Sequence, residues 1–446
     1  MRQIDLSADA LVQALTAAEG RKAHILDSCG VGRVGANRLI GGLEPVHVEV
    51  ISGRDARESL ALLERLIDSR DLASVFTIGY DLGARLHGTA NSQISSEPDI
   101  YVALFDRLFF HNYDTGATFQ IGRVDEPIEP LSGFLKAGRE HSAIPDDRRP
   151  PVRSNFTRSG YIEAVSRIQE LIRAGETYQT NLTQQFEAPL PDGRLPSDVF
   201  LSLRRDHPAP YAALIERPDS TVISVSPEQF FMVESKGSER KIVAEPIKGT
   251  RPRGLDNAED KRLRTELAAS EKDRAENVMI VDLMRNDLGR ICEFGSVRVD
   301  DLYRIDEHPT LFHLVSTVSG VLRNGIGPAE ILEALFPCGS ITGAPKIRTM
   351  QLIDEIELVP RGLSMGAIGC RIPESFGLGE IFEASVAIRT MVVRDGVARF
   401  NVGGGIVIDS DPIAEYEESL LKAKALFRAL GVNVAGSSQL SARAEP

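Results

Sequence analysis

The order of strand-like and helix-like segments constrains the fold of this chain more than any other feature of its sequence. Strand-like runs such as VHVEVIS and VFTIGYD alternate with a helix-like RESLALLERLID in the first part of the chain. Strands and helices then mix without the regular strand–helix–strand alternation of a doubly wound parallel sheet. We therefore expect an α+β fold with largely antiparallel sheets.

Three later segments carry apolar residues at helical spacing. The first, SGYIEAVSRIQELIRAG, ends at Gly175, a typical residue at the C-terminal end of a helix. The second is SEKDRAENVMIVDLMRNDLGRI. The third is DSDPIAEYEESLLKAKALF, where Ser410 or Asp411 can cap the helix and Pro412 suits its first turn.

A polar, proline-rich stretch at residues 139–155 predicts a linker or a long surface loop. It separates an N-terminal region, residues 1–145, from a larger C-terminal region, residues 155–432. Residues 433–446 contain too few apolar side chains to pack, so we expect a disordered tail.

Charge and composition exclude several classes of protein. A net charge of -13 argues against a nucleic-acid partner held by counterion release. The opening residues lack a secretory signal, and no apolar run of about 18 residues predicts a membrane span. The cysteines are scattered without CxxC spacing, which favours reduced thiols in a cytoplasmic protein over disulfides or a zinc site: Cys29, Cys292, Cys338 and Cys370.

The stretch EPIKGTRPRG places Lys248 between a proline and a glycine, in what we interpret as a tight turn. Burial or neighbouring cations would lower the pKa of this amine and leave part of it uncharged, as a nucleophilic lysine requires. A solvated turn lysine is the alternative, and on this stretch alone it is the better-supported one.

Carboxylates on two of the expected helices form a candidate metal site. Glu276 lies beside the apolar face of the second helix, and Glu415 and Glu418 share a face of the third. Oxygen ligands without a matching histidine or cysteine set favour Mg²⁺ over zinc. The alternative is a pair of ordinary helix salt bridges, Lys272–Glu276 and Glu418–Lys422.

Two glycine-containing segments predict an anion site. In FNVGGGIVIDS the glycines Gly403, Gly404 and Gly405 follow a strand-like run and could offer backbone N–H groups to a carboxylate. In FPCGSITGAPKIRTM, Ser340 and Lys346 lie near the start of an expected helix. Arg389, in FEASVAIRTMVV, is a candidate bidentate carboxylate ligand. Together these segments indicate a site for a small dianion with a metal.

The order of these segments resembles that of the chorismate-utilising enzymes. The resemblance covers residues 175–424, through GETYQTNLTQQF, SPEQF, PIKGTRPRG, KDRAENVMIVDLMRNDLGRI, FHLVSTVSG, FPCGSITGAPK, AIRT and GGGIVIDS…AEYEES. The N-terminal region matches more loosely, mainly through HILDSCG around Ser28. The resemblance implies an anthranilate-synthase-like fold: two orthogonal, largely antiparallel sheets flanked by helices, with chorismate and Mg²⁺ in the cleft between them.

Lys248 discriminates within that family, because its anthranilate synthases carry alanine there and its aminodeoxychorismate synthases carry lysine. The resemblance therefore implies conversion of chorismate and ammonia to 4-amino-4-deoxychorismate through a covalent lysine adduct, for 4-aminobenzoate and folate synthesis. The alternatives are anthranilate synthase component I, an isochorismate or salicylate synthase, and a catalytically silent chorismate-binding homologue. No glutaminase Cys-His-Glu set is found in the sequence, so the ammonia would be free ammonia or would come from a separate glutamine amidotransferase subunit.

The resemblance also implies roles for individual residues. Lys248 would be the nucleophile and Glu228, of SPEQF, the acid, while a chemical and a structural role for His313 are equally open. Glu276, Glu415 and Glu418 would hold Mg²⁺. Substrate contacts would come from Thr250, Ser340, Lys346, Arg389, Gly403, Gly404 and Gly405.

Two further positions concern possible ligand pockets. Ser28 fits a pocket that binds tryptophan in relatives. Cys370 stands where relatives often carry a tyrosine that contacts the substrate, and this substitution puts one substrate contact in doubt.

Overall fold

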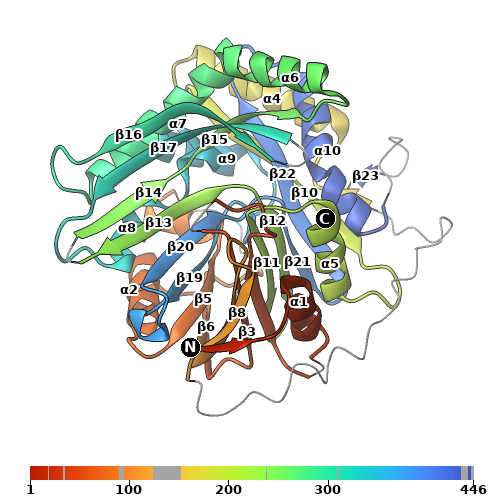
Figure 1. The fold of residues 1–446 in the computed structure, drawn as a ribbon. Helices are drawn as coiled ribbons and strands as arrows, with labels where there is room; N and C mark the ends of the chain where they lie inside the picture. Colours follow the sequence, from red (N-terminus) through yellow and green to blue (C-terminus); the bar gives the residue numbers. More distant parts are fainter. Residues whose placement is uncertain are drawn as a thin grey trace.

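The computed structural model describes residues 1–18, 20–33, 36–89, 95–123, 152–237, 239–308, 311–432 and 440–442. Two β-sheets form the centre of the molecule, and helices pack around them (Figure 1).

The larger sheet contains thirteen strands among the described residues. Strand β18 (Gly343–Ala344) pairs with β10, off the main path of the sheet. The main path runs in the order β1 (Arg2–Ile4), β8 (Ala117–Gly122), β7 (Arg107–Asn112), β3 (Arg38–Leu43), β2 (Ala23–Asp27), β11 (Tyr211–Glu216), β12 (Thr221–Ser226), β21 (Thr390–Arg394), β22 (Val397–Ile406), β10 (Gln179–Pro189), β9 (Val152–Ser154) and β23 (Leu440–Ala442).

The smaller sheet contains ten strands among the described residues. Strand β16 (Arg298–Glu307) pairs with β17, off the main path. That path runs in the order β15 (Ile247–Pro252), β17 (Leu311–Val321), β14 (Glu239–Ala244), β13 (Gln229–Lys236), β20 (Ile381–Val386), β19 (Ala367–Ile372), β5 (Ala73–Ile78), β6 (Ile100–Phe105) and β4 (His47–Ile51).

Strands from the N-terminal and C-terminal regions alternate within both sheets. In the larger sheet β2 pairs with β11, and in the smaller sheet β5 pairs with β19. The two regions that the sequence separates along the chain therefore share both sheets.

Two sequence expectations fall partly outside the described residues. Of the predicted linker 139–155, residues 139–151 lie outside them, and Val152–Ser154 forms strand β9 rather than a loop. Of the tail 433–446, only 440–442 are described. They form strand β23, paired in parallel with β9, which corrects the expectation of disorder for these three residues.

The helices pack on the outside of the sheets, and α4, α6, α7 and α10 lie together near one end of the molecule (Figure 1). The described α-helices are α1 (Ala8–Thr16), α2 (Ala56–Ile67), α3 (Tyr80–Leu86), α4 (Arg158–Arg173), α5 (Pro196–Asp206), α6 (Asn257–Ala269), α7 (Glu271–Gly289), α8 (Pro328–Leu335), α9 (Lys346–Ile356) and α10 (Pro412–Ala429), with short 3₁₀ helices η4 (Gly339–Ile341) and η5 (Glu374–Phe376).

The three helices predicted from periodicity are confirmed as α4, α7 and α10. Helix α4 is followed by Gly175 with a φ of 78°, a left-handed conformation that glycine adopts without strain. Helix α10 has Asp411 as its N-cap, whose side chain accepts a hydrogen bond from the Ala414 N–H, and Pro412 in its first turn. Local sequence signals thus fixed these helix ends correctly.

The sheets confirm the predicted α+β class. Every named strand pair in the described residues is antiparallel except β9 with β23. None of the helices in the described ranges is both long and apolar enough to cross a membrane. All four cysteines are free thiols, as expected.

An aromatic cluster joins β10, β22 and α10 in the core of the larger sheet. Phe186, Phe400 and Phe427 are fully buried, and their ring centroids lie 5.0 to 5.7 Å apart. Phe186 and Phe400 are register partners across the two strands. Dispersion and burial in this cluster fix α10 against the sheet.

We expect Phe186→Ala to lower the free energy of unfolding by about 3–5 kcal/mol, because a large cavity would remain between β10, β22 and α10. Urea denaturation measures this change. Phe294→Ala is the matched control, since Phe294 is fully exposed and should change stability by less than about 0.5 kcal/mol. Equal effects of the two variants would contradict this account of the core.

Candidate active site

Lys248 lies in a strand with a bulge rather than in the tight turn that the sequence suggested. The register of β15 with β17 passes from Ile247 opposite Val315 to Thr250 opposite His313, so β15 contains one extra residue. A bulge of this kind redirects the side chains beside it. The turn interpretation was wrong because the pairing with β17 is not visible in the local sequence.

Gly249 makes this bulge possible. Its φ is 85°, in the left-handed region, and an added Cβ would lie 2.9 Å from the Asp273 side chain of α7. Glycine is therefore required here for both backbone conformation and close packing against α7.

The amine of Lys248 lies in the interior, 3.5 Å from the carbonyl oxygen of Ser340 in η4. Burial lowers the pKa of Lys248, Glu276 and Glu228 oppose that shift, and the Lys422 ammonium adds to it. Both causes foreseen from the sequence, burial and a neighbouring cation, therefore act on Lys248.

Glu228, between β12 and β13, is 4% exposed, and its Oε1 atom has no hydrogen-bond partner among the described residues. Burial raises the pKa of Glu228 to about 7, against the opposing effects of Ser340, Lys248 and the Ile247 N–H. A carboxyl with this pKa exists in both protonation states near neutral pH, as an acid–base catalyst requires.

His313 and Thr250 form a hydrogen-bonded pair across β15 and β17. Thr250 Oγ1 lies 2.9 Å from His313 Nδ1. Burial, followed by the Arg389 charge, lowers the pKa of His313 to about 3, so its ring is neutral near pH 7. His313 is thus a neutral hydrogen-bonding group in the wall of the site.

Arg389, between β20 and β21, supplies a cation to the same wall. Its φ of 48° is uncommon for a residue other than glycine. Burial lowers its pKa and Glu228 raises it, and no hydrogen bond or ion pair of its guanidinium is found within the described ranges. A guanidinium in this environment can donate two parallel hydrogen bonds to a carboxylate.

The glycines Gly403, Gly404 and Gly405 lie within β22 and not in a turn after it, which corrects the sequence interpretation. They pair with Thr183, Leu182 and Asn181 of β10. Glycine in a strand often marks a close approach of other groups.

A side chain at each of these glycines would press against a neighbouring group. A Cβ at Gly403 would clash with the Leu182 carbonyl oxygen. A Cβ at Gly404 would lie 3.1 Å from Glu415 Oε2, and one at Gly405 would lie 3.4 Å from Lys248 Nζ. Gly404 therefore allows the close approach of Glu415, and Gly405 that of the Lys248 amine.

The three glutamates predicted to bind a metal come from α7 and α10 and influence one another. Burial raises the pKa of Glu276 and of Glu415, and the neighbouring Glu415 and Glu418, respectively, add to these shifts. Glu415 Oε1 also accepts a hydrogen bond of 2.7 Å from the Ser410 hydroxyl. Glu415 thus lies near enough to both Glu276 and Glu418 for their charges to interact.

Both predicted helix salt bridges are also present: Lys422 Nζ lies 2.8 Å from Glu418 Oε1, and Lys272 Nζ lies 4.0 Å from Glu276 Oε1. Within the described ranges, no group of three or more histidine, cysteine, aspartate or glutamate side chains is gathered closely enough to hold an ion. In this arrangement lysine ammoniums pair with Glu276 and Glu418.

The hydrogen bonds of Lys346 connect it to other groups than Lys248, Glu228 or Arg389. Its amine donates to Asp287 Oδ2 at 2.6 Å and to the Leu335 carbonyl oxygen at 2.8 Å, in a buried ion pair at the start of α9. The sequence could not show this partner, because Asp287 lies 59 residues away on the inner face of α7. Ser340, six residues earlier, does lie beside Lys248.

Gln179, the first residue of β10, is a candidate site residue that we did not single out from the sequence. It is fully buried, and neither its amide nitrogen nor its amide oxygen has a hydrogen-bond partner among the described residues. A Cβ at Gly405 would clash with Gln179 Nε2, which places this amide next to the Lys248 amine. The sequence signal that could have identified Gln179 is its position as a polar residue at the start of a strand-like segment.

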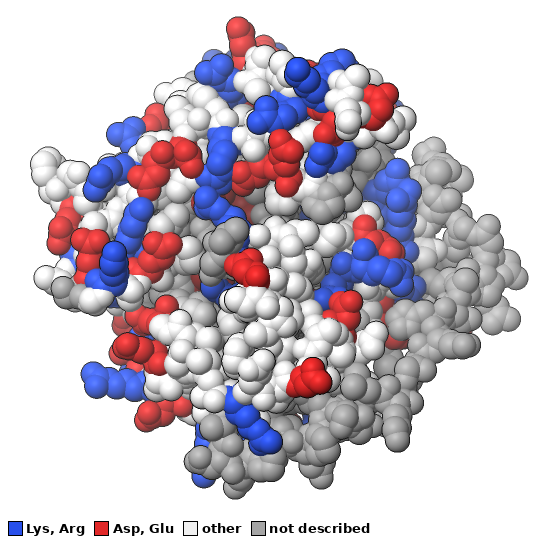
Figure 2. Space-filling view, in the orientation of Figure 1, with Lys and Arg blue, Asp and Glu red and all other residues white. Residues whose placement is uncertain are grey.

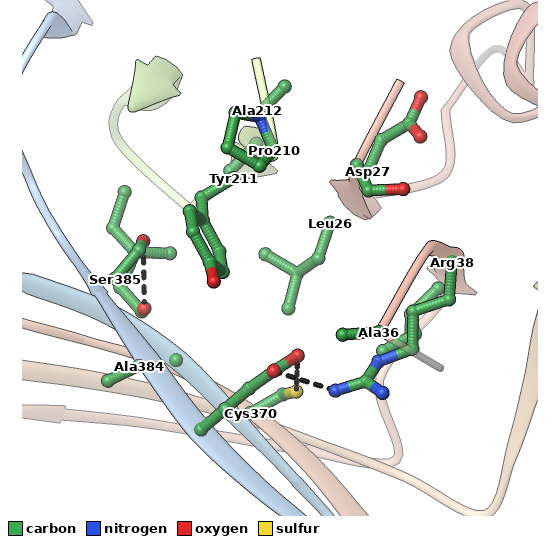
Figure 3. Close-up of a pocket in the computed structure, with 16 residues that line it drawn as sticks. Leu26, Asp27, Ala36, Arg38, Pro210, Tyr211, Ala212, Cys370, Ala384 and Ser385 are labelled. Carbon is green, nitrogen blue, oxygen red and sulfur yellow. Dashed lines mark hydrogen bonds and ion pairs between the residues drawn. The ribbon is translucent and has the colours of Figure 1, made fainter. Parts of the chain in front are cut away.

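Ser28 and Cys370 line a pocket between the two sheets (Figure 3). Ser28 Oγ donates to Asn37 Oδ1 at 2.7 Å, and Arg38 pairs with Glu383 at 2.6 Å. The Cys370 thiol lies 4.0 Å from Glu383 Oε1 in this pocket, and its effect on a substrate contact stays a prediction.

The exposed charges do not form a basic patch on the face seen in Figure 2, where lysine and arginine alternate with aspartate and glutamate. The cations that concern the site, on Lys248 and Arg389, lie in the interior instead.

A family model for chorismate binding enzymes matches residues 21–428. The chain belongs to this family. The structure resembles anthranilate synthase component I from Streptococcus pneumoniae with a TM-score of 0.73 and 26% sequence identity, over 87% of this chain and 91% of that one. This likeness confirms the predicted anthranilate-synthase-like fold.

Relatives within the family carry two kinds of name. Aminodeoxychorismate synthase from Streptomyces griseus is 40% identical over 80% of this chain and 50% of its own length, so the chain spans about half of that relative. Aminodeoxychorismate synthase component 1 from Bacillus subtilis is 37% identical over 75% of this chain and 71% of its length. Anthranilate synthase component 1 1 from Haloarcula marismortui is 37% identical over 79% and 74%.

We expect Lys248 to react with an amine reagent at lower pH than an exposed lysine, because burial favours its uncharged form. Labelling at each pH, followed by peptide mass spectrometry, gives the titration of Lys248, with the exposed Lys261 of α6 as internal reference. A Lys248 titration at or above that of Lys261 would contradict the environment described here.

We expect Glu228→Gln to stabilise the protein more at pH 8 than at pH 4.5. The pKa of Glu228 is raised in the folded state, so the unfolded state releases the proton first, and stability is lost as pH rises toward about 7. Glutamine does not titrate, so the variant should avoid this loss of roughly 1–3 kcal/mol in the free energy of unfolding. Urea denaturation at both pH values tests this, with the exposed Glu417→Gln as control. A gain that does not depend on pH would refute the assignment.

Proposed function

We propose that this chain is an aminodeoxychorismate synthase, which converts chorismate and ammonia to 4-amino-4-deoxychorismate. The observation that supports this most directly is the environment of Lys248: an amine whose pKa is lowered by burial and which interacts with the charges of Glu276 and Glu228. Two of the relatives described above bear that name, at 40% and 37% identity.

The proposed reaction proceeds in two displacements. The uncharged Lys248 amine attacks ring carbon C2 and forms a C–N bond, while the C4 hydroxyl leaves as water with a proton from Glu228. Ammonia then attacks C4, the bond from Lys248 to C2 breaks and returns the amine, and the Glu228 carboxylate takes back a proton from the new C4 ammonium. The enolpyruvyl group stays attached throughout. The lowered pKa of Lys248 and the raised pKa of Glu228 suit these roles.

Other residues of the wall would orient the substrate. The Arg389 guanidinium, without a bonded partner in the described part, suits one substrate carboxylate. Thr250 and the neutral His313 would line the ring, and Ser340 would lie beside Lys248 and Glu228. Gln179 adds an amide that a polar substrate group could satisfy.

The donor set fits Mg²⁺ in its chemistry. Glu276, Glu415 and Glu418 offer hard oxygen ligands, and two of them have pKa values raised partly by their carboxylate neighbours, which a divalent cation would relieve. These residues would hold the metal after release of Lys272 and Lys422. When bound, Mg²⁺ would supply positive charge for the ring carboxylate of chorismate.

The proposal also includes a source of ammonia and an amino-acid ligand for the pocket that contains Ser28. The Bacillus subtilis relative is called component 1, which supports a separate subunit, here a glutamine amidotransferase that supplies ammonia. The pocket that contains Ser28 is the position at which an amino acid such as tryptophan would bind.

Incubation of the purified chain with chorismate, Mg²⁺ and an ammonium salt tests the function without a partner. We expect 4-amino-4-deoxychorismate, identified by chromatography and mass spectrometry. Anthranilate as the product would favour an anthranilate synthase, which is also the name of the Haloarcula relative. Isochorismate would favour an isochorismate or salicylate synthase. Turnover of none of these would support a silent chorismate-binding protein.

Lys248→Ala tests the covalent step. We expect formation of 4-amino-4-deoxychorismate to fall by at least about 100-fold, since no internal nucleophile would remain. Lys261→Ala, at an exposed position of α6, is the control and should retain full activity. An unchanged rate and product in Lys248→Ala would remove this lysine from the mechanism.

A further inference from the structure

Arg361 and Glu357 form a buried ion pair that the proposed reaction does not use. Their side chains are 2% and 3% exposed, and the guanidinium donates to both carboxylate oxygens, at 2.8 Å from Nε and 2.7 Å from Nη2. The ring of Tyr80, from α3, lies under the guanidinium, 4.5 Å from its central carbon. Neither residue was singled out from the sequence.

The pair is bonded to two backbone segments that line the candidate site. Arg361 donates to the carbonyl oxygen of Ile341 in η4 at 2.9 Å and to that of Asn181 in β10 at 2.7 Å. Glu357 Oε1 accepts from the Thr183 N–H of β10 at 2.7 Å. One ion pair therefore connects η4 to β10.

Segment η4 contacts the reactive amine, and β10 lies beside it. Ile341 follows Ser340, whose carbonyl oxygen accepts from Lys248. Asn181 follows Gln179 by two residues and is the register partner of Gly405, beneath the Lys248 amine. A shift of Arg361 would move the groups on both sides of Lys248.

Stability alone is a weak reason for such a pair. Burying two charges costs about as much desolvation free energy as their attraction returns, and well-packed apolar residues often serve equally well. A guanidinium fork, however, fixes several acceptors at once in a defined geometry. The three backbone contacts of this pair are its distinctive property.

We infer that Arg361, held by Glu357, is a positioning residue that fixes η4 and β10 on either side of Lys248. The inference rests on the proposed function for its kinetic consequences, but the placement of Lys248 can be measured without turnover. In Arg361→Lys the positive charge is kept, and the fork that reaches the Ile341 and Asn181 carbonyls together is lost.

Arg361→Lys is tested with chorismate, Mg²⁺ and an ammonium salt. We expect kcat to fall at least about tenfold with KM changed by less than about threefold, because a small misplacement of reacting groups affects the chemical step most. In pH-dependent labelling of Lys248, we expect the titration to move up toward that of the exposed Lys261, since a loosened wall admits water.

Arg217→Lys is the matched control. Arg217 is also 2% exposed and bonds to Glu97 at 2.8 Å, in the hairpin between β11 and β12. We expect it to lose thermal stability as Arg361→Lys does, while kcat and the Lys248 titration stay unchanged. Glu357→Gln, which keeps the side-chain shape, replaces Arg361→Lys if that variant does not fold, with the same expected directions.

The outcomes separate this inference from the proposed function. If Arg361→Lys matches Arg217→Lys in kcat and in the Lys248 titration, the pair is only structural and the inference is overturned. If the unaltered chain forms a different product, the proposed function fails, and the labelling of Lys248 still decides the role of Arg361.

Discussion

The antiparallel pairing of β10 with β22 is the interaction on which the rest of the structure depends. It joins ten residue pairs, from Thr180 with Ile406 to Pro189 with Val397. In its middle Phe186 and Phe400 anchor α10 through Phe427, and α10 carries Glu415 and Glu418. At one end the strand pair places Gly404 beside Glu415 and Gly405 beside the Lys248 amine. The same ladder thus sets both the core and the position of the carboxylates (Figure 1).

Burial acts in opposite directions on the two groups that matter most for the proposed chemistry. It lowers the pKa of Lys248 and raises the pKa of Glu228, so each moves toward its uncharged form. Each also opposes the shift of the other, which limits the loss of charge. A buried site can therefore bring an amine and a carboxyl group closer to their uncharged forms than water does.

Local signals in the sequence predicted the helices and the α+β class, because periodicity and capping depend on neighbouring residues. The same signals misplaced the backbone of Lys248 and of Gly403–Gly405, which are strand residues whose partners are remote in the chain. The ion pair of Lys346 with Asp287 was likewise invisible. The resemblance to chorismate-utilising enzymes supplied the gathering of Lys248, Glu228, Arg389 and the glutamates, which no local pattern could provide.

Several polar groups around Lys248 have no bonded partner within the described part of the chain. They are the amide of Gln179, one carboxyl oxygen of Glu228 and the guanidinium of Arg389. Buried polar groups without partners cost free energy, and a fold that served stability alone would replace or pair them. Their donors and acceptors match the carboxylates and hydroxyl of a small polar dianion such as chorismate. The free energy lost in the unliganded protein is recovered when a substrate completes these bonds. This favours a role in substrate binding for Gln179, Glu228 and Arg389 as well as for Lys248.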